Sequence, residues 1–417
     1  MSPVRTRLLA ALSLTLTLGA CADDEAPSPD IAALMKEAER IRELRFVTSP
    51  RVETRDPNEF VATSAQQTRA LTDREVARDL AVWGRLGYYP PGFDLRGTGA
   101  AVASTVAAYY DPEDKALVLF DPTAKGTIVH ELVHALQDQT FDLYASSVDG
   151  TSDAQLARAA VVEGDATLCG ARYQLRGQSD PLRAITDRLD AVGTSEDVLG
   201  DDTSPALLRA RAGIAYTFGS GAVARVAGFY EPTPVFRRER VDALFRDARP
   251  GTTEEILRTS LGLPIDPRVD VGLRAVPAPL ADRYEIEEVD RLGAWLSYVL
   301  LRRFADRAAM RELALGWDGD QLVVIRPHTL ESPSLLPLPV AVVWTSSWDD
   351  AATASRVATE LVRVQGARRA EGDDARAFVA ADDQPLWIEP SEERVVFVKG
   401  IPYADMAALA AEALAAR

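Results

Sequence analysis

The sequence has few residues that crosslink a chain: among its 417 residues only Cys21 and Cys169 are cysteines. A disulfide framework therefore cannot hold this fold, and its stability must come from a packed core. Positive charge is also scarce, since 46 lysines and arginines stand against 63 aspartates and glutamates, for a net charge of −17. Such a chain lacks the basic footprint that grips phosphates, so we expect no nucleic-acid partner.

Long hydrophobic runs are missing beyond the N-terminus, where a transmembrane helix would need about 18 consecutive apolar residues. The uncharged run 8–18 follows two arginines and has the length of a signal-peptide core. It ends in LGAC, which resembles the bacterial lipobox, in which the cysteine is acylated. We therefore predict a lipoprotein signal peptide over residues 1–20, lipidation at Cys21 and a tether over residues 21–30. The protein would be exported and lipid-anchored to a bacterial membrane, on its periplasmic or cell-surface side; a plain secretory signal is the alternative.

The rest of the composition is that of a folded protein, with 47% hydrophobic and 26% charged residues. A chain of this length usually forms more than one domain. Helical patterns and one hairpin fill residues 31–264, whereas residues 265–417 alternate strands and helices. We therefore predict an α+β fold, with a first domain over 31–264 and a second α+β unit over 265–417.

A β-hairpin is predicted just before a histidine-containing helix. Residues 102–110 and 116–120 are rich in strand-forming side chains and flank the turn sequence DPED at 111–114. Thr72, followed three residues later by Glu75, is the pattern of a capping box at the start of a helix. Helices are predicted over residues 30–45, 72–86, 122–141 and 152–174.

Residues 130–134 read HELVH, an instance of the motif HExxH. On a helix, His130 and His134 lie one above the other on a single face, so both imidazoles can bind one metal ion. Glu131 lies beside them, where a carboxylate can take the proton of a metal-activated water. These donors favour Zn²⁺, whose catalytic sites keep one position open. The alternative is a solvated surface helix, which the apolar residues around the histidines disfavour.

A catalytic zinc site needs a third protein ligand, and the remaining histidine, His328, lies far downstream. The best candidate is Glu163 on the next predicted helix, because its apolar neighbours would make an unpaired carboxylate costly to bury. A divalent cation would offset that cost. Gly164 beside it would let another backbone approach closely. The fallback ligands are Asp142, Asp153 and Asp165.

Three further residues are candidates for supporting roles. Asp138 follows His134 by four residues and could accept a hydrogen bond from a metal-binding imidazole, although a solvated aspartate is an equal alternative. Asp165, beside the predicted glutamate ligand, is a candidate for the same role. Tyr216 could donate to the oxyanion of a tetrahedral intermediate, with an ordinary core tyrosine as the alternative.

HExxH followed by a glutamate on the next helix resembles the gluzincin branch of the zincin metallopeptidases, which includes thermolysin. More narrowly, the chain is similar to a family of bacterial exported or lipoprotein-type zinc peptidases. The similarity rests on the segments 110–112 (YDP), 130–142, 163–166 (EGDA), 216–219, 253–257, 316–320 and 348–351, together with Trp344. The sequence departs from the family pattern at Ala215, where proline is frequent, and at Arg258, where histidine is frequent.

The resemblance implies a zincin-like catalytic domain whose HExxH helix packs on a small β-sheet. It also implies bound zinc, peptide-bond hydrolysis, His130, His134 and Glu163 as ligands, and Glu131 as general base. It supplies no particular substrate.

The first functional hypothesis is a membrane-anchored zinc metallopeptidase that binds a peptide or protein substrate along the edge of strand 116–120. A zinc hydrolase that acts on cell-wall peptide or another amide differs only in its substrate. The alternative is a non-catalytic metal-binding envelope lipoprotein that acts as a binding or structural module. Glu131 favours an enzyme, because a structural metal site needs ligands but no base.

Overall fold

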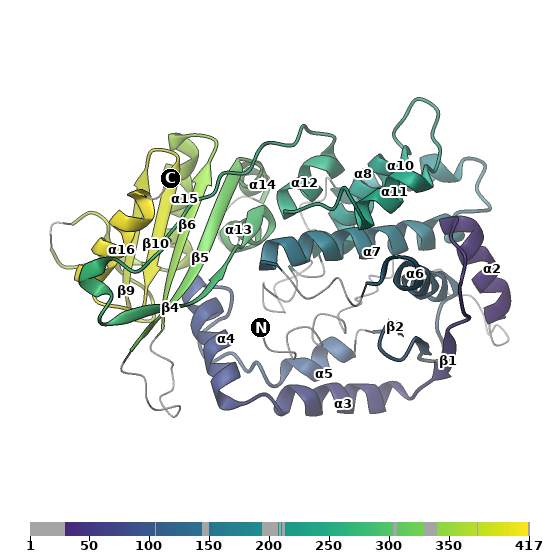
Figure 1. Ribbon diagram of the computed structural model, residues 1–417, viewed down its shortest axis with the longest axis horizontal. Coiled ribbons are helices and arrows are strands. Elements are labelled where there is room, and N and C mark those ends of the chain that lie inside the picture. Colours follow the sequence, from purple (N-terminus) through teal and green to yellow (C-terminus); the bar gives the residue numbers. More distant parts are fainter. Residues whose placement is uncertain are drawn as a thin grey trace.

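The computed structural model describes residues 30–104, 106–143, 150–193, 207, 210, 213–302, 307–328, 340–372 and 374–415. The predicted signal peptide, Cys21 and all but the last residue of the tether lie outside these residues. The described fold is α+β, as predicted, with most helices at one end and a large sheet at the other (Figure 1). In this part of the chain, no helix combines the length and apolar character needed to cross a membrane.

The N-terminal elements include the histidine-containing helix, α6, and the small sheet on which it packs. They are α2 (Ile31–Arg42), β1 (Arg51–Thr54), α3 (Pro57–Arg69), α4 (Asp73–Leu86), α5 (Thr98–Ala103), β2 (Ala108–Asp111), β3 (Ala116–Leu119), α6 (Lys125–Phe141) and α7 (Ser152–Gln174). Helix α4 begins with the predicted capping box: Thr72 Oγ1 accepts from the Glu75 N–H, and the Glu75 carboxylate accepts from the Thr72 N–H. Helix α7 spans the predicted residues 152–174.

The hairpin forms as predicted, but two details of the prediction were wrong. Residues 98–103 form helix α5, so the first strand begins only at Ala108 instead of residue 102. Strand β3 is not an edge, because β1 joins its other side in parallel and the order is β1-β3-β2. An added peptide strand therefore has no free side of β3 to pair with.

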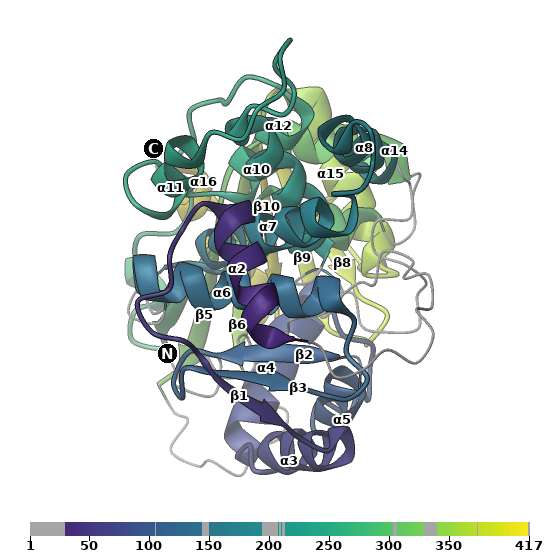
Figure 2. The same ribbon diagram turned by 90° about the vertical axis from the view of Figure 1, so that its right-hand side faces the viewer.

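Helix α6 is buried from Gly126 to Asp138, which explains why its sequence is apolar on nearly every face. One side packs on the small sheet and on α2, through a cluster that includes Leu117, Ile128 and Leu132. Helix α7 crosses α6 above the sheet, and α2 lies against α6 from the outside (Figure 2). The helix with the two histidines is therefore enclosed by elements from three parts of the chain.

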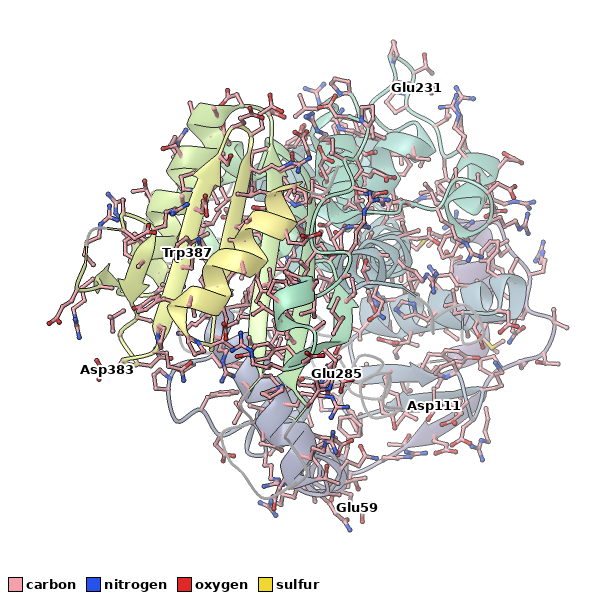
Figure 3. All side chains as sticks on the ribbon, turned by 60° about the vertical axis from the view of Figure 1, so that its left-hand side comes forward. Glu59, Asp111, Glu231, Glu285, Asp383 and Trp387 are labelled. Carbon is pink, nitrogen blue, oxygen red and sulfur yellow. The ribbon has the colours of Figure 1, made fainter. Side chains whose placement is uncertain are left out.

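The C-terminal elements build a second layer of helices and an antiparallel sheet. They are α8 (Pro181–Gly193), the π-helix η1 (Ile214–Gly219), α10 (Ser220–Ala227), α11 (Arg238–Phe245), α12 (Thr253–Leu261), the 3-10 helix η2 (Ala278–Leu280), β4 (Tyr284–Asp290), α13 (Gly293–Leu301), α14 (Arg307–Leu315), β5 (Trp317–Pro327), β6 (Ala341–Trp348), α15 (Ala351–Val364), β7 (Arg368–Arg369), β8 (Ala377–Val379), β9 (Pro385–Ser391), β10 (Arg394–Lys399) and α16 (Tyr403–Ala415). The strand order is β4-β5-β6-β10-β9-β8-β7. Helix α16 covers the face that carries Trp387 (Figure 3).

One hydrophobic core extends from the helices into the large sheet. It includes Ala160 of α7, Phe218 of η1, Trp295 of α13 and Trp344 of β6, all of which are buried. The predicted boundary between residues 264 and 265 therefore lies beside a core to which both predicted units contribute. This packing holds α7, which carries Glu163, against the rest of the protein.

Candidate metal centre

Helices α6 and α7 bring three predicted ligands together. Glu163 Oε2 lies 3.3 Å from His130 Nε2 and 3.3 Å from His134 Nε2. The two imidazole Nε2 atoms are 3.0 Å apart. Among the described residues this is the one group of three or more His, Cys, Asp or Glu side chains whose ligand atoms converge. HExxH places the histidines by helical spacing, whereas Glu163 joins them because α7 packs on α6.

The spacing of these donors matches a tetrahedral metal site. Two ligands that each lie 2.0–2.1 Å from a tetrahedral ion are about 3.3–3.4 Å apart. The three observed separations are 3.0, 3.3 and 3.3 Å. Two imidazoles and one carboxylate are also the donor set of catalytic zinc sites, which leave a fourth position for water or substrate. The residues present therefore fit Zn²⁺.

The imidazoles and the carboxylate shift one another's pKa. Burial opposes the charge on His134, but the neighbouring Glu163 carboxylate outweighs it and raises the pKa of His134 to about 9. Burial opposes the charge on Glu163 as well, yet His134 and His130 hold the pKa of Glu163 well below its usual range. The carboxylate is thus kept ionised in a buried position, where a cation is favoured.

Glu131 is fully buried, and the described residues hydrogen-bond to one of its two carboxylate oxygens. Its Oε2 accepts a hydrogen bond from the Tyr110 N–H at 2.9 Å. Its Oε1 makes no hydrogen bond to the described residues. Burial, only partly offset by His130 and His134, raises the pKa of Glu131. The structure therefore fixes the orientation of this carboxylate through β2 and leaves one acceptor available beside the histidines.

Tyr216 reaches the same centre from the π-helix η1, a conformation that recurs at functional sites. Its ring lies 6.2 Å from the His130 ring, centroid to centroid, at an interplanar angle of 29°. Its hydroxyl is buried and makes no hydrogen bond within the described part of the chain. Burial, followed by the charges of Glu163 and Glu131, raises its pKa well above the ordinary value. At neutral pH the phenol therefore retains its proton and can donate it.

A contact between two glycines sets the position of η1. A Cβ built on Gly164 would lie 2.4 Å from the carbonyl carbon of Gly219, and one on Gly219 would lie 2.1 Å from the Ala160 oxygen. Only residues without a Cβ allow the backbones of α7 and η1 to meet at this distance. The prediction that Gly164 permits close approach of another backbone is therefore confirmed.

The hydrogen-bond partner of His134 is Gln137 rather than the predicted Asp138. The His134 Nδ1 and Gln137 Oε1 atoms are 2.9 Å apart. Asp138 instead accepts hydrogen bonds from the Tyr110 hydroxyl at 2.9 Å and from Lys115 Nζ at 2.7 Å. Sequence reasoning missed Gln137, although a glutamine three residues after a histidine on an apolar helix was a usable signal.

The fallback ligands lie elsewhere. Asp165 accepts hydrogen bonds from Gln137 and Arg42, so it contacts the centre through Gln137. Asp142 is the C-cap of α6 in the left-handed conformation. Asp153 accepts two hydrogen bonds from Thr253. None of the three belongs to the convergent group with the histidines.

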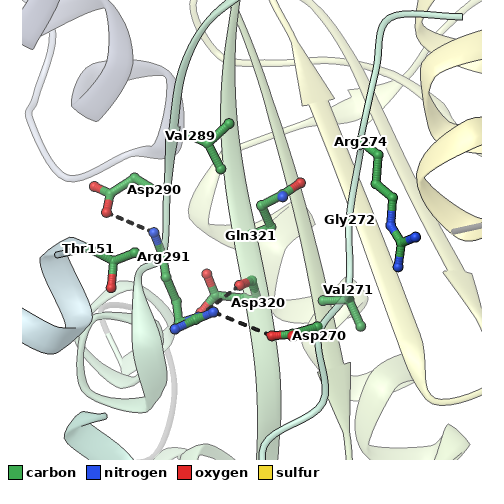
Figure 4. Close-up of a pocket in the computed structure, with 10 residues that line it drawn as sticks. All are labelled: Thr151, Asp270, Val271, Gly272, Arg274, Val289, Asp290, Arg291, Asp320 and Gln321. Carbon is green, nitrogen blue, oxygen red and sulfur yellow. Dashed lines mark hydrogen bonds and ion pairs between the residues drawn. The ribbon is translucent and has the colours of Figure 1, made fainter. Parts of the chain in front are cut away.

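A separate cavity of about 280 Å³ lies where the N-terminus of α7 meets β4 and β5 (Figure 4). Its lining includes Thr151, Asp290 and Asp320. Arg291 extends across it between Asp290 and Asp270. The cavity contains none of the residues predicted for the metal centre.

Comparison with known proteins adds one similarity. Residues 282–410 match a family model described as "Domain of unknown function (DUF8575)". This range lies within the predicted second unit and covers the large sheet from β4 to the first part of α16. No curated protein and no solved structure matches the chain. The candidate metal centre lies N-terminal to the matched range.

Proposed function

We propose that this protein is a membrane-anchored, zinc-dependent metallopeptidase with a zincin-like catalytic domain. His130, His134 and Glu163 would hold the metal, Cys21 would carry the lipid anchor and a peptide or protein would be the substrate. The resemblance to gluzincins and the tetrahedral spacing of the three donors support the metal and its ligands. The free oxygen of Glu131 and the free hydroxyl of Tyr216 support catalysis.

Zinc in such a centre polarises a carbonyl group and lowers the pKa of a bound water to about 7. Glu131 would act as general base, because Oε1 is free and its raised pKa brings it closer to that of the proton donor. The Tyr110 N–H holds Oε2 and so keeps Oε1 directed at the centre. Tyr216 would donate its phenolic hydrogen to the oxygen of the scissile carbonyl as negative charge develops there.

The edge that could receive an extended peptide is β2, because β3 is paired on both sides. The Tyr110 N–H points to Glu131, so the outward side of β2 faces the catalytic carboxylate. A substrate strand added to β2 would lie beside the metal ligands.

The proposal rests on one observation: buried polar atoms of the centre are not fully hydrogen-bonded by other residues of the described protein. Glu131 Oε1 and Tyr216 Oη are buried and make no hydrogen bond to the described residues, and Glu163 Oε2 is buried with the two imidazole Nε2 atoms 3.3 Å away. A buried polar atom without a partner is costly, so such an atom usually binds an ion, a water or a ligand. A structural zinc site would explain Glu163 but would leave Glu131 and Tyr216 without a purpose.

The test compares the full-length protein with the variants Glu131→Gln and Glu163→Ala. Elemental analysis should find one zinc per chain in the parent and in Glu131→Gln, and strongly reduced zinc in Glu163→Ala. A peptide library should be cleaved by the parent alone. Retained cleavage in Glu131→Gln would refute the mechanism, and a parent without stoichiometric metal would refute the metal centre.

A further inference from the structure

A buried chain of hydrogen bonds connects the first helix to the metal centre. Arg42, the last residue of α2, is completely buried and donates from Nε to Asp165 Oδ2 at 2.7 Å. The same carboxylate oxygen accepts from Gln137 Nε2 at 2.9 Å. Gln137 Oε1 in turn lies 2.9 Å from His134 Nδ1. Three contacts therefore link a residue of α2 to a metal-binding imidazole.

This series of hydrogen bonds determines the orientation of the His134 imidazole and which of its nitrogens faces the centre. The amide Nε2 of Gln137 donates to Asp165 and to the Val162 carbonyl at 3.0 Å, so both of its hydrogens are used. The amide oxygen must therefore face His134, and it can only accept a hydrogen bond. Nδ1 of His134 therefore keeps its proton when a metal ion binds, and Nε2 is the nitrogen that offers its lone pair to the metal.

Arg42 is held in place by surroundings that suit a guanidinium and little else. A second nitrogen, Nη2, donates to Asp242 Oδ1 at 2.7 Å. The rings of Phe141, Phe236 and Phe245 lie around it, with centroids about 6 Å from its Cζ atom. A planar group that pairs with two carboxylates and packs among aromatic rings cannot be replaced by lysine without losing one of these contacts.

We propose that Arg42 is a positioning residue for the metal centre. It fixes Asp165, which orients the Gln137 amide, which sets the tautomer of His134. The inference rests on the proposed function in that it takes His134 to be a zinc ligand. It adds that α2, the first helix after the predicted tether, supports the centre through a buried side chain.

The packing of α2 supports this reading. Leu34, Ala38 and Ile41 are buried in the same cluster as Val129 and Leu136 of the metal-binding helix. Removal of α2 would uncover this side of α6 and leave the buried Asp165 carboxylate without its cation. An uncompensated buried charge is strongly unfavourable, so the centre would rearrange.

The test measures zinc affinity in the full-length protein by competition with a chromogenic chelator. Arg42→Met and Gln137→Met should each raise the zinc Kd by roughly 10- to 100-fold, as loss of a hydrogen-bonded partner behind a ligand usually does. Both should also change the visible absorption bands of the cobalt-loaded protein, which report the coordination geometry. Gln137→Met keeps the length of the side chain, and it tests the link to His134 if Arg42→Met fails to fold.

The matched control is Asp242→Asn. Asp242 and Asp165 each lie 2.7 Å from Arg42. Asp165 also accepts a hydrogen bond from Gln137 and so belongs to the series that leads to His134, whereas Asp242 does not. This variant should lower the melting temperature while zinc Kd stays within about 3-fold of the parent and the cobalt spectrum is unchanged. If Gln137→Met already raises the zinc Kd, adding Arg42→Met should raise it little further, because the two residues act in series.

Three results would overturn the proposal. One is a folded Arg42→Met or Gln137→Met variant with the parent's zinc Kd and cobalt spectrum. Another is an equal loss of affinity in Asp242→Asn, which would indicate a general stability effect. The third is a parent that binds no zinc, which would refute the proposed function as well. A parent that binds zinc but cleaves no peptide would refute only the function, because the affinity series would still test the role of Arg42.

Discussion

Replacing Gly164 by alanine should separate the two backbones that place Tyr216 at the candidate metal centre. The new Cβ would lie 2.4 Å from the Gly219 carbonyl carbon, 2.5 Å from its oxygen and 2.7 Å from the Ser220 nitrogen. Ordinary van der Waals contact begins at 3.4 Å, and none of these atoms belongs to a flexible side chain. The π-helix must therefore move away from α7 by about 1 Å.

A shift of this size has a cost in stability and a larger cost in activity. Overpacking of a core contact typically destabilises a protein by about 1–3 kcal/mol. A displacement of about 1 Å at a catalytic group can lower the rate by about 10²-fold. We expect kcat on a cleaved library peptide to fall by roughly that factor, with one zinc per chain retained because the ligands lie on α6 and α7.

The assay pairs steady-state kinetics and urea unfolding with a second glycine variant. Gly84 lies in α4, and a Cβ there would meet no heavy atom within 4 Å. Gly84→Ala should leave kcat unchanged and raise the free energy of unfolding by about 0.5–1 kcal/mol, since alanine is favoured inside helices. If Gly164→Ala matched the parent in kcat and stability, the glycine contact would not position Tyr216.

Two further predictions concern a phenol and a buried carboxyl group. Tyr216→Phe should lower kcat by roughly 10²- to 10³-fold with zinc content unchanged, since the hydroxyl makes no hydrogen bond to the described protein; an unaltered kcat would remove Tyr216 from the mechanism. Burial raises the pKa of Asp153 to about 7, partly offset by hydrogen bonds from Thr253. The unfolded chain releases the Asp153 proton near pH 3.9, whereas the folded protein retains it up to about pH 7. The free energy of unfolding therefore falls by roughly 4 kcal/mol as the pH rises from about 4 to about 7. Asp153→Asn should flatten the fall in unfolding free energy between pH 5 and pH 8, measured with urea, and parallel curves for parent and variant would contradict this assignment.

Local features of this protein could be read from the sequence because neighbouring residues determine them. The helix that carries His130 and His134, the capping box of Thr72 and Glu75, and the hairpin were predicted and are present. Their hydrogen bonds join residues a few positions apart, so short patterns decide them. The chemical reasoning about Glu163 also selected a residue that the fold brings to the histidines, although its role as a ligand stays a prediction.

Tertiary packing decided what joins distant parts of the chain. Strand β1 pairs with β3 in parallel, which made the predicted edge strand a central one. Residues 102 and 103 were predicted to begin a strand but end helix α5, since tertiary context overrides weak strand propensity. Such choices depend on partners that no local window contains.

The side chains around the candidate metal centre also divide into those placed by local sequence and those placed by tertiary packing. HExxH spacing is a property of one helix, but the choice of Gln137 over Asp138 depends on where each side chain finds a partner. Arg42 contacts Asp165 across 123 residues of sequence. The sequence by itself determined that His130, Glu131 and His134 lie together, because about one turn of helix α6 holds all three. Only the packing of α2 and α7 on α6 decided that the buried Arg42 and Asp165 pair beside these residues. A buried charge needs an opposite charge close by, and that partner can come from any part of the fold.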